Sequence, residues 1–314
     1  MNDISRNKNI SPKCKFVDTK EAIGIVGLGL IGGSLAKAIR SKTDCRLFGN
    51  DICTDSLSAA LDDGVIDGEL TDETLAQCSL VLVCLYPDDV IFFCKSNMKS
   101  MKKGTVIVDC AGVKTRICKE VSALAKDLGL TFFGGHPMAG IERLGYSSSF
   151  AELFKGATMI LCESKHQEEK ILKELGLFFT TIGFANIKVT TAEEHDKIIA
   201  YTSQLAHLVS SAYIKSDTVN KRYGFSAGSF KDLTRVARLD TDMWTELFFE
   251  NRENLLNECD KYIENVKKYR DALRSQDESA MKELLKTGTE LKITDDRNER
   301  EWLTKTSGKS DKNT

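Results

Sequence analysis

The sequence lacks the features that mark membrane, secreted and nucleic-acid-binding proteins. No apolar run approaches the roughly 20 residues that a membrane-spanning helix needs, and residues 1–15 are polar, without an apolar signal segment. A net charge of -2 offers no electrostatic case for binding nucleic acid. We therefore expect a cytoplasmic protein that binds neither a membrane nor nucleic acid.

The sequence also lacks the cysteine patterns of disulfide-rich or zinc-binding proteins. It has ten cysteines but no C-x-x-C pair and no Cys/His cluster at zinc spacing. Cys84 and Cys110 lie in apolar, strand-like runs, where thiols are typically buried and reduced. We expect free thiols and no bound metal.

The chain of 314 residues is long enough for two domains, and its two parts differ in pattern. Up to residue 190, apolar strand-like runs alternate with helical segments, which predicts a Rossmann-type α/β domain with a parallel sheet and right-handed crossovers. The expected strands are 23–26, 46–51, 79–85, 105–109, 131–134, 158–162 and 186–190, and the expected helices are 30–40, 88–101 and 114–128.

After residue 191 there is no further strand-like run and no proline, which predicts an all-α domain. The expected helices are 191–217, 226–239, 241–275 and 278–291. Apolar faces on such helices commonly pair two subunits, so we predict a homodimer. The expected divisions are an N-terminal arm (1–20), a dinucleotide-binding domain (21–190), a helical dimerisation and substrate domain (191–303) and a flexible tail (304–314).

A glycine loop at residues 27–32 (GLGLIG) directly follows the strand ending at Val26 and opens a helix. Gly27 would permit the tight turn, Gly29 the close approach of a pyrophosphate, and Gly32 the packing of helix on strand. Leu30 and Ile31 begin the helix, whose N-terminus favours phosphate. The loop predicts a bound dinucleotide.

Asp51 lies 19 residues after Gly32, at the end of the next expected strand. A carboxylate at this spacing can accept hydrogen bonds from both ribose hydroxyls, and it would repel a 2′-phosphate. The predicted cofactor is therefore NAD rather than NADP. Arg46 lies at the opposite end of that strand and could not neutralise such a phosphate.

Four further polar features could carry chemistry. His136 lies in a segment rich in glycine at a strand end, Ser203 and His207 are spaced i, i+4 on one helix, and Arg235 suits carboxylate recognition. Trp244 is the fourth. Taken one at a time, each has an ordinary structural explanation: a turn cap, a polar helix pair, a surface arginine and a core tryptophan.

Together these segments resemble the prephenate and arogenate dehydrogenases of tyrosine biosynthesis, and prephenate dehydrogenase most. The matching stretches are GIVGLGLIGGSLAKAI (24–39), GGHPMAG (134–140), HDKIIAYTSQLAHLVS (195–210) and GSFKDLTRVARLDTDMW (228–244). They occur in the family's order and spacing, and the likeness runs from about residue 22 to 256. GGHPMAG and the FKDLTR segment are specific, whereas the glycine loop is shared with many dehydrogenases.

The resemblance implies an active site between a Rossmann domain and a helical dimerisation domain. It makes His136 the catalytic histidine that binds the ring hydroxyl and Arg235 the partner of the ring carboxylate. Its other implied site residues are Ser203 and His207 lining the pocket, Glu142 and Asp232 in an ionic network around Arg235, Trp244 as a pocket wall, and Gly112 beside the nicotinamide.

The implied reaction is NAD-dependent oxidative decarboxylation of prephenate to 4-hydroxyphenylpyruvate. Three alternatives remain: the same chemistry on arogenate to give tyrosine, a related 3-hydroxyacid dehydrogenase, and a catalytically impaired NAD-binding sensor. The sensor rests on Gly112, because the family usually has a serine there. A second departure is Ala206, where proline is common. Because little chain follows the helices, we also expect no appended regulatory domain.

Overall fold

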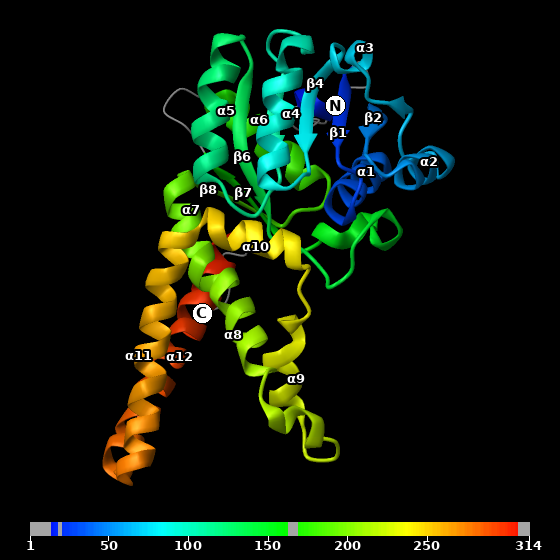
Figure 1. The fold of residues 1–314 in the computed structure, drawn as a ribbon. Helices are drawn as coiled ribbons and strands as arrows, with labels where there is room; N and C mark the ends of the chain where they lie inside the picture. Colours follow the sequence, from blue (N-terminus) through cyan, green and yellow to red (C-terminus); the bar gives the residue numbers. More distant parts are fainter. Residues whose placement is uncertain (1–13, 18–20, 163–168, 307–314) are drawn as a thin grey trace, which may run out of the picture. The chain divides into compact units, whose positions relative to one another are not determined.

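The computed structural model describes residues 14–17, 21–162 and 169–306 (Figure 1). The chain forms two compact units, Met1–Glu193 and Glu194–Thr314. No helix in the described ranges is both long and apolar enough to span a membrane.

The first unit is built on an eight-stranded sheet with the order β3-β2-β1-β4-β5-β6-β7-β8. Its strands are β1 (Ala22–Val26), β2 (Arg46–Asn50), β3 (Gly68–Glu69), β4 (Cys78–Val83), β5 (Val106–Asp109), β6 (Thr131–Pro137), β7 (Thr158–Cys162) and β8 (Asn186–Thr190). Neighbouring strands pair in parallel from β3 through β6, and β7 pairs in parallel with β8. The predicted Rossmann-type α/β fold is confirmed.

The expectation of a wholly parallel sheet is wrong at one step, because β6 and β7 pair antiparallel. The segment between them holds only the short 3₁₀ helices η3 (Tyr146–Ser148) and η4 (Ala151–Phe154). A parallel return needs a crossover that spans the sheet, usually a full helix, so the chain instead comes back alongside β6 in the opposite direction.

Helices cover both faces of this sheet. They are α1 (Leu30–Lys42), α2 (Thr54–Asp62), α3 (Asp72–Leu75), α4 (Pro87–Asn97), α5 (Thr115–Asp127) and α6 (Glu169–Thr181). Buried side chains of α1 and α6 join the core cluster on one face, and those of α4 and α5 join the cluster on the other. All six residues of β4 are buried, as a strand packed on both faces requires.

A short helix lies within the expected N-terminal arm. Residues 15–17 form η1 (Lys15–Val17), and Phe16 is fully buried with its ring 6.1 Å from that of Phe178 on α6. The rest of the arm, residues 1–13 and 18–20, lies outside the described residues, as do residues 307–314 of the expected tail.

The direction of strand order reverses between β1 and β4. The chain runs outward from β1 to β2 and β3, and then returns to place β4 on the other side of β1. In open α/β sheets, ligands bind at the carboxyl ends of the two strands flanking such a switch point. A bound dinucleotide is therefore expected at this edge of the sheet.

The second unit is helical, as predicted. After α7 (Ala192–Ile199), which starts at the end of the first unit, it contains the π-helix η5 (Ala200–Leu205), α8 (Ala206–Tyr213), η6 (Asp217–Lys221), α9 (Gly228–Thr234), η7 (Arg235–Ala237), α10 (Thr241–Glu250), α11 (Arg252–Ser275) and α12 (Glu278–Thr306). The long helices α11 and α12 run side by side (Figure 1).

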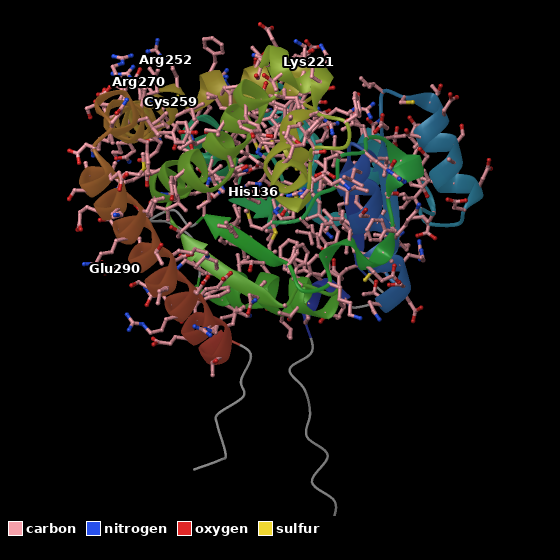
Figure 2. All side chains as sticks on the ribbon, turned by 90° about the horizontal axis from the view of Figure 1, so that it is seen from below. His136, Lys221, Arg252, Cys259, Arg270 and Glu290 are labelled. Carbon is pink, nitrogen blue, oxygen red and sulfur yellow. The ribbon has the colours of Figure 1, made fainter. Side chains whose placement is uncertain are left out.

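The helices of this unit differ in their bounds from those expected. The expected helix 191–217 ends sooner and is interrupted by the π-helix, and the helix 241–275 is divided at Asn251. Helix α12 continues to Thr306 instead of ending at residue 291. Charged side chains such as Arg270 on α11 and Glu290 on α12 stand out from these helices in Figure 2. Charged and polar residues also dominate the sequence after residue 293, so its apolar residues are too few to mark where α12 ends.

Candidate functional site

The turn of the glycine loop can be made only by glycine at two positions. Gly27 follows β1 with φ at 84°, and a Cβ there would lie 2.4 Å from the carbonyl oxygen of Cys84. A Cβ on Gly32 would lie 1.8 Å from the carbonyl oxygen of Gly27. Both contacts are with backbone, which cannot move aside, so the loop packs tightly against its own strand and β4.

Gly29 has a different environment. A Cβ there would meet nothing within 4 Å, so the space beside it is open. Gly29 is the N-cap of α1, no side chain caps the helix, and Leu30 and Ile31 form the first turn. An uncapped helix N-terminus facing open space can donate its N–H groups and direct its dipole to a phosphate.

Asp51 is fixed beside this loop by two backbone groups. Its Oδ2 accepts a hydrogen bond from the N–H of Leu28 at 2.6 Å, and its Oδ1 accepts one from the N–H of Cys53 at 2.7 Å. Each carboxylate oxygen keeps a lone pair for a ribose hydroxyl. Arg46, at the far end of β2, donates to Gln77 at 2.9 Å.

A buried ion pair lies at the carboxyl end of β5. Asp109 and Lys114 are both fully buried, and Asp109 Oδ1 accepts from the Lys114 ammonium and from the N–H of Ala111. Burial raises the pKa of Asp109, and the Lys114 charge opposes that rise. The pair closes the turn that contains half-buried Gly112. It was not predicted from the sequence, although a lysine so close to a buried strand was a usable signal.

Two thiols lie side by side at the same edge. Cys84 follows β4 and Cys110 follows β5, one step beyond the paired residues Val83 and Asp109. Hydrogen bonding with Cys110 and burial hold the pKa of the Cys84 thiol well above its usual range. A protonated thiol is a poor nucleophile, so Cys84 serves as a packing group. All ten cysteines are free thiols.

His136 lies on β6, because the strand continues three residues beyond its expected end. It is half-buried and pairs with Ile160 of β7. A Cβ on Gly135 would lie 2.4 Å from the Asp109 carbonyl oxygen, and one on Gly134 would lie 2.7 Å from the Cys118 sulfur. These two glycines therefore make room for neighbouring protein atoms. Glu142 follows in the exposed loop after β6.

In the second unit, the structure brings His207 and Trp244 together. Their rings stack with centroids 4.0 Å apart at 30°. His207 Nδ1 lies 2.8 Å from the carbonyl oxygen of Ser203, so the predicted i, i+4 pair meets through the backbone of Ser203. A carbonyl oxygen can only accept a hydrogen bond, so Nδ1 of His207 carries the proton of this bond. Nε2 is the ring nitrogen that this bond does not use.

Arg235 lies on the turn η7, directly after α9, and α8 packs against both elements. Asp232 precedes it by three residues on α9, and both side chains are exposed. Helix α8, which carries His207, therefore adjoins the segment that carries Arg235.

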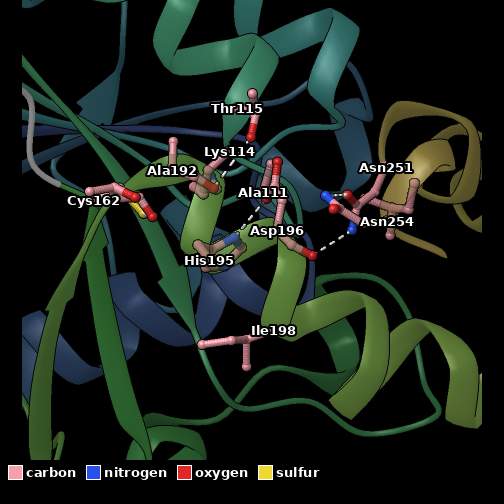
Figure 3. A network of polar contacts seen from close by, with 12 residues as sticks. Ala111, Lys114, Thr115, Cys162, Ala192, His195, Asp196, Ile198, Asn251 and Asn254 are labelled. Carbon is pink, nitrogen blue, oxygen red and sulfur yellow. Dashed lines mark hydrogen bonds and ion pairs between the residues drawn. The ribbon is translucent and has the colours of Figure 1, made fainter. Parts of the chain in front are cut away.

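A buried polar network, shown in Figure 3, joins α7, the π-helix and the start of α11. His195 Nδ1 lies 2.7 Å from Asp196 Oδ1. Asn251 Nδ2 donates to the carbonyl oxygen of Asp196 and to Gln204 Oε1, each at 2.7 Å, and Gln204 Nε2 donates to the carbonyl oxygen of Leu247 at 2.8 Å. The sequence offered no local signal for this network, because its partners are up to 55 residues apart. No cluster of three potential metal ligands occurs in the described part of the chain.

Comparisons with known proteins agree with this arrangement. A sequence model described as "Prephenate dehydrogenase, nucleotide-binding domain" matches residues 35–188, and one described as "Prephenate dehydrogenase, dimerization domain" matches residues 191–287. The chain is 30% identical over 282 residues to the cyclohexadienyl dehydrogenase of Zymomonas mobilis subsp. mobilis, covering 86% of this chain and 94% of that protein. It is 29% identical to the prephenate dehydrogenase of Lactococcus lactis subsp. cremoris, covering 85% and 75%.

A similar solved structure is that of prephenate dehydrogenase from Aquifex aeolicus in complex with hydroxyphenyl propionate and NAD+. It superposes with a TM-score of 0.75 at 27% identity, covering 88% of this chain and 98% of that one. Synechocystis arogenate dehydrogenase shares the fold, with a TM-score of 0.74 at 23% identity. The two sequence models together span most of the chain, one for each unit, and the chain belongs to the prephenate dehydrogenase family.

Proposed function

We propose that this chain catalyses the NAD-dependent oxidative decarboxylation of prephenate to 4-hydroxyphenylpyruvate, a step of tyrosine biosynthesis. The observation that carries the proposal is the open helix N-terminus at Gly29 with Asp51 fixed beside it, on the same sheet whose β6 carries His136. Membership of the family and the NAD+ complex of the similar Aquifex aeolicus enzyme support it.

NAD fits the residues present. The N–H groups at Gly29, Leu30 and Ile31 would hold the pyrophosphate, Asp51 would accept the ribose hydroxyls, and Gly112 would lie beside the nicotinamide. Bound NAD would supply the hydride acceptor. The Asp51 carboxylate disfavours NADP because it would meet a 2′-phosphate with like charge.

His136 is the proposed general base. As a neutral imidazole it would hold the ring hydroxyl at C4 of the substrate and take its proton as the hydride leaves that carbon. Loss of the C1 carboxylate as CO2 makes the ring aromatic and drives the step, so the protein mainly has to orient groups.

Arg235 is the proposed partner of the ring carboxylate, because a guanidinium can bind both of its oxygens. Ser203 and His207 would complete the pocket with polar groups and Trp244 would form its wall, consistent with the His207–Trp244 stack. Glu142 and Asp232 would form the ionic network that orients Arg235.

Arogenate is the second candidate substrate, because it has the same ring, hydroxyl and ring carboxylate, and the same His136 and Arg235 would serve it. It differs in its side chain, an ammonium in place of the keto group. The product would then be tyrosine.

We also propose a homodimer built on the helical unit, which we place at residues 191–303. Large apolar side chains of α11 are exposed in the single chain: Leu256, Tyr262, Ile263, Val266 and Leu273. A patch of this kind is typical of a subunit interface, and the second sequence model describes a dimerisation domain. A reducing, cytoplasmic setting is part of the proposal, since it would keep the ten thiols free.

The test is a parallel assay of the purified protein with NAD and either prephenate or arogenate, followed by NADH absorbance and product identification. The proposal expects NADH and 4-hydroxyphenylpyruvate from prephenate. Formation of tyrosine from arogenate, with no product from prephenate, would support arogenate as the substrate. Intact NAD binding with NADH from neither substrate would favour the sensor and overturn the proposal.

A further inference from the structure

The π-helix η5 (Ala200–Leu205) departs from ordinary helical geometry within a helix that carries proposed site residues. Its hydrogen bonds span five residues in place of four, so it contains an extra residue that an α-helix would not accommodate, and such segments occur often at functional sites. Ser203 lies within it and His207 lies two residues beyond its end. The register of the π-helix therefore sets the direction of both side chains.

Asn251 contacts the chain both before the π-helix and inside it. The residue lies where α10 and α11 meet, with backbone angles of -112° and 26°, and it is 4% exposed. One side-chain nitrogen donates to the Asp196 carbonyl oxygen before the π-helix and to Gln204 Oε1 inside it. The Asn251 amide thus bridges the stretch over which the helical bonding pattern changes.

Gln204 extends this bridge to α10. Its amide nitrogen donates to the carbonyl oxygen of Leu247, and the side chain is 2% exposed. Trp244 lies three residues before Leu247 on α10, and His207 lies three residues after Gln204. The two hydrogen-bonded partners are thus each about one helical turn from the two stacked rings.

We infer that Asn251 and Gln204 are a positioning pair: they lock the π-helix to α10 and so hold His207 on Trp244 in the geometry that binds the cyclohexadiene substrate. Neither residue touches the substrate in this account. The inference rests on the proposed function for its kinetic part only. Because both side chains are buried, replacing Asn251 leaves Gln204 Oε1 without this donor in the interior, and replacing Gln204 removes the link from Asn251 to α10.

The test uses the full-length protein with Trp302→Phe as background, which leaves Trp244 as the sole tryptophan. Asn251→Leu keeps the branched side-chain shape but removes both donated hydrogen bonds and the one that Asn251 Oδ1 accepts from Asn254. Asn257→Leu is the matched control, because Asn257 is an exposed asparagine on the same helix, α11. Gln204→Met is the second variant, used in the same way where Asn251→Leu does not fold. Melting temperature and circular dichroism select the folded proteins.

The expected result has two parts. Trp244 emission changes in intensity because the His207 ring leaves the indole, and the KM for the cyclohexadiene rises about tenfold while the KM for NAD stays the same. The Asn257→Leu control changes neither. A purely structural role would lower the melting temperature and leave both the emission and the KM unchanged.

Two outcomes would overturn the inference: a folded variant with unchanged Trp244 emission, or one with changed emission and an unchanged substrate KM. A wild-type protein that turns over neither substrate would instead contradict the proposed function. In that case the emission change alone decides whether Asn251 and Gln204 hold the stack.

Discussion

Replacing Gly29 with alanine separates the dinucleotide role of the glycine loop from its role in folding. The Cβ would meet no protein atom within 4 Å, and the φ of -69° is one that alanine adopts readily. Alanine is a poorer N-cap than glycine, so we expect a loss of at most about 1 kcal/mol in the free energy of unfolding. The methyl group would, however, occupy the space where the pyrophosphate approaches the helix.

The expected loss of NAD affinity follows from the hydrogen bonds that the methyl group displaces. One bond to a charged group is worth about 1.5–3 kcal/mol, so losing one raises the Kd for NAD about 10- to 150-fold. Gly32→Ala is the contrasting variant. Its Cβ would lie 1.8 Å from the Gly27 carbonyl oxygen, so the overpacked loop should cost about 1–3 kcal/mol or more of stability.

The assay is NAD titration by calorimetry together with urea unfolding of each variant. We expect Gly29→Ala to have nearly the stability of the wild type and to bind NAD weakly. Wild-type NAD affinity in Gly29→Ala would refute the placement of the pyrophosphate at this helix. A large loss of stability in the same variant would refute the open space beside Gly29.

Further predictions concern the remaining groups. His136→Asn should lower kcat about 10²–10⁴-fold in steady-state assays, the usual contribution of a general base, and near-normal turnover would remove His136 from that role. Arg235→Gln should mainly raise the KM for the substrate, since the carboxylate is bound before the transition state; an unchanged KM would contradict the assignment. Asp51→Asn should narrow the preference for NAD over NADP, measured as the ratio of the two kcat/KM values, and an unaltered ratio would count against its role at the ribose. Lys114→Met should lower the free energy of unfolding, measured with urea, by about 3–5 kcal/mol, because it leaves Asp109 buried without its cation. The double variant Lys114→Met, Asp109→Leu should recover most of that loss. A single variant as stable as wild type would show that the ion pair contributes nothing to stability.

The strands were the most predictable part of the fold. β7 and β8 have the bounds that the sequence indicated, and β4 was recognisable because five of its six buried residues are apolar. Helix α2 was missed because it buries only Ala60, so its sequence shows almost no apolar face. The antiparallel pairing of β7 with β6 was missed because it depends on the connecting segment, which lacks a full helix. The sequences of the two strands do not indicate their relative direction.

The candidate site was predictable where its chemistry requires a particular residue type. Glycine at 27 and 32 follows from backbone sterics, and the proposed role of the carboxylate at 51 follows from the ribose hydroxyls that it would bind, so a short motif indicates them. Asn251, Gln204 and Asp196 act through contacts between distant segments, and no spacing rule brings them together. The proposed roles of His136 and Arg235 rest on the family likeness, because an isolated histidine or arginine is ambiguous in a single sequence.

Hydride transfer from the ring carbon and loss of the ring carboxylate should occur in one reaction on NAD. The most direct measurement uses prephenate deuterated at C4 and carrying labelled carbon in its ring carboxylate. We expect deuterium in the NADH formed, and one labelled CO2 released for each NADH. NADH without deuterium, or NADH formed without release of labelled CO2, would contradict it.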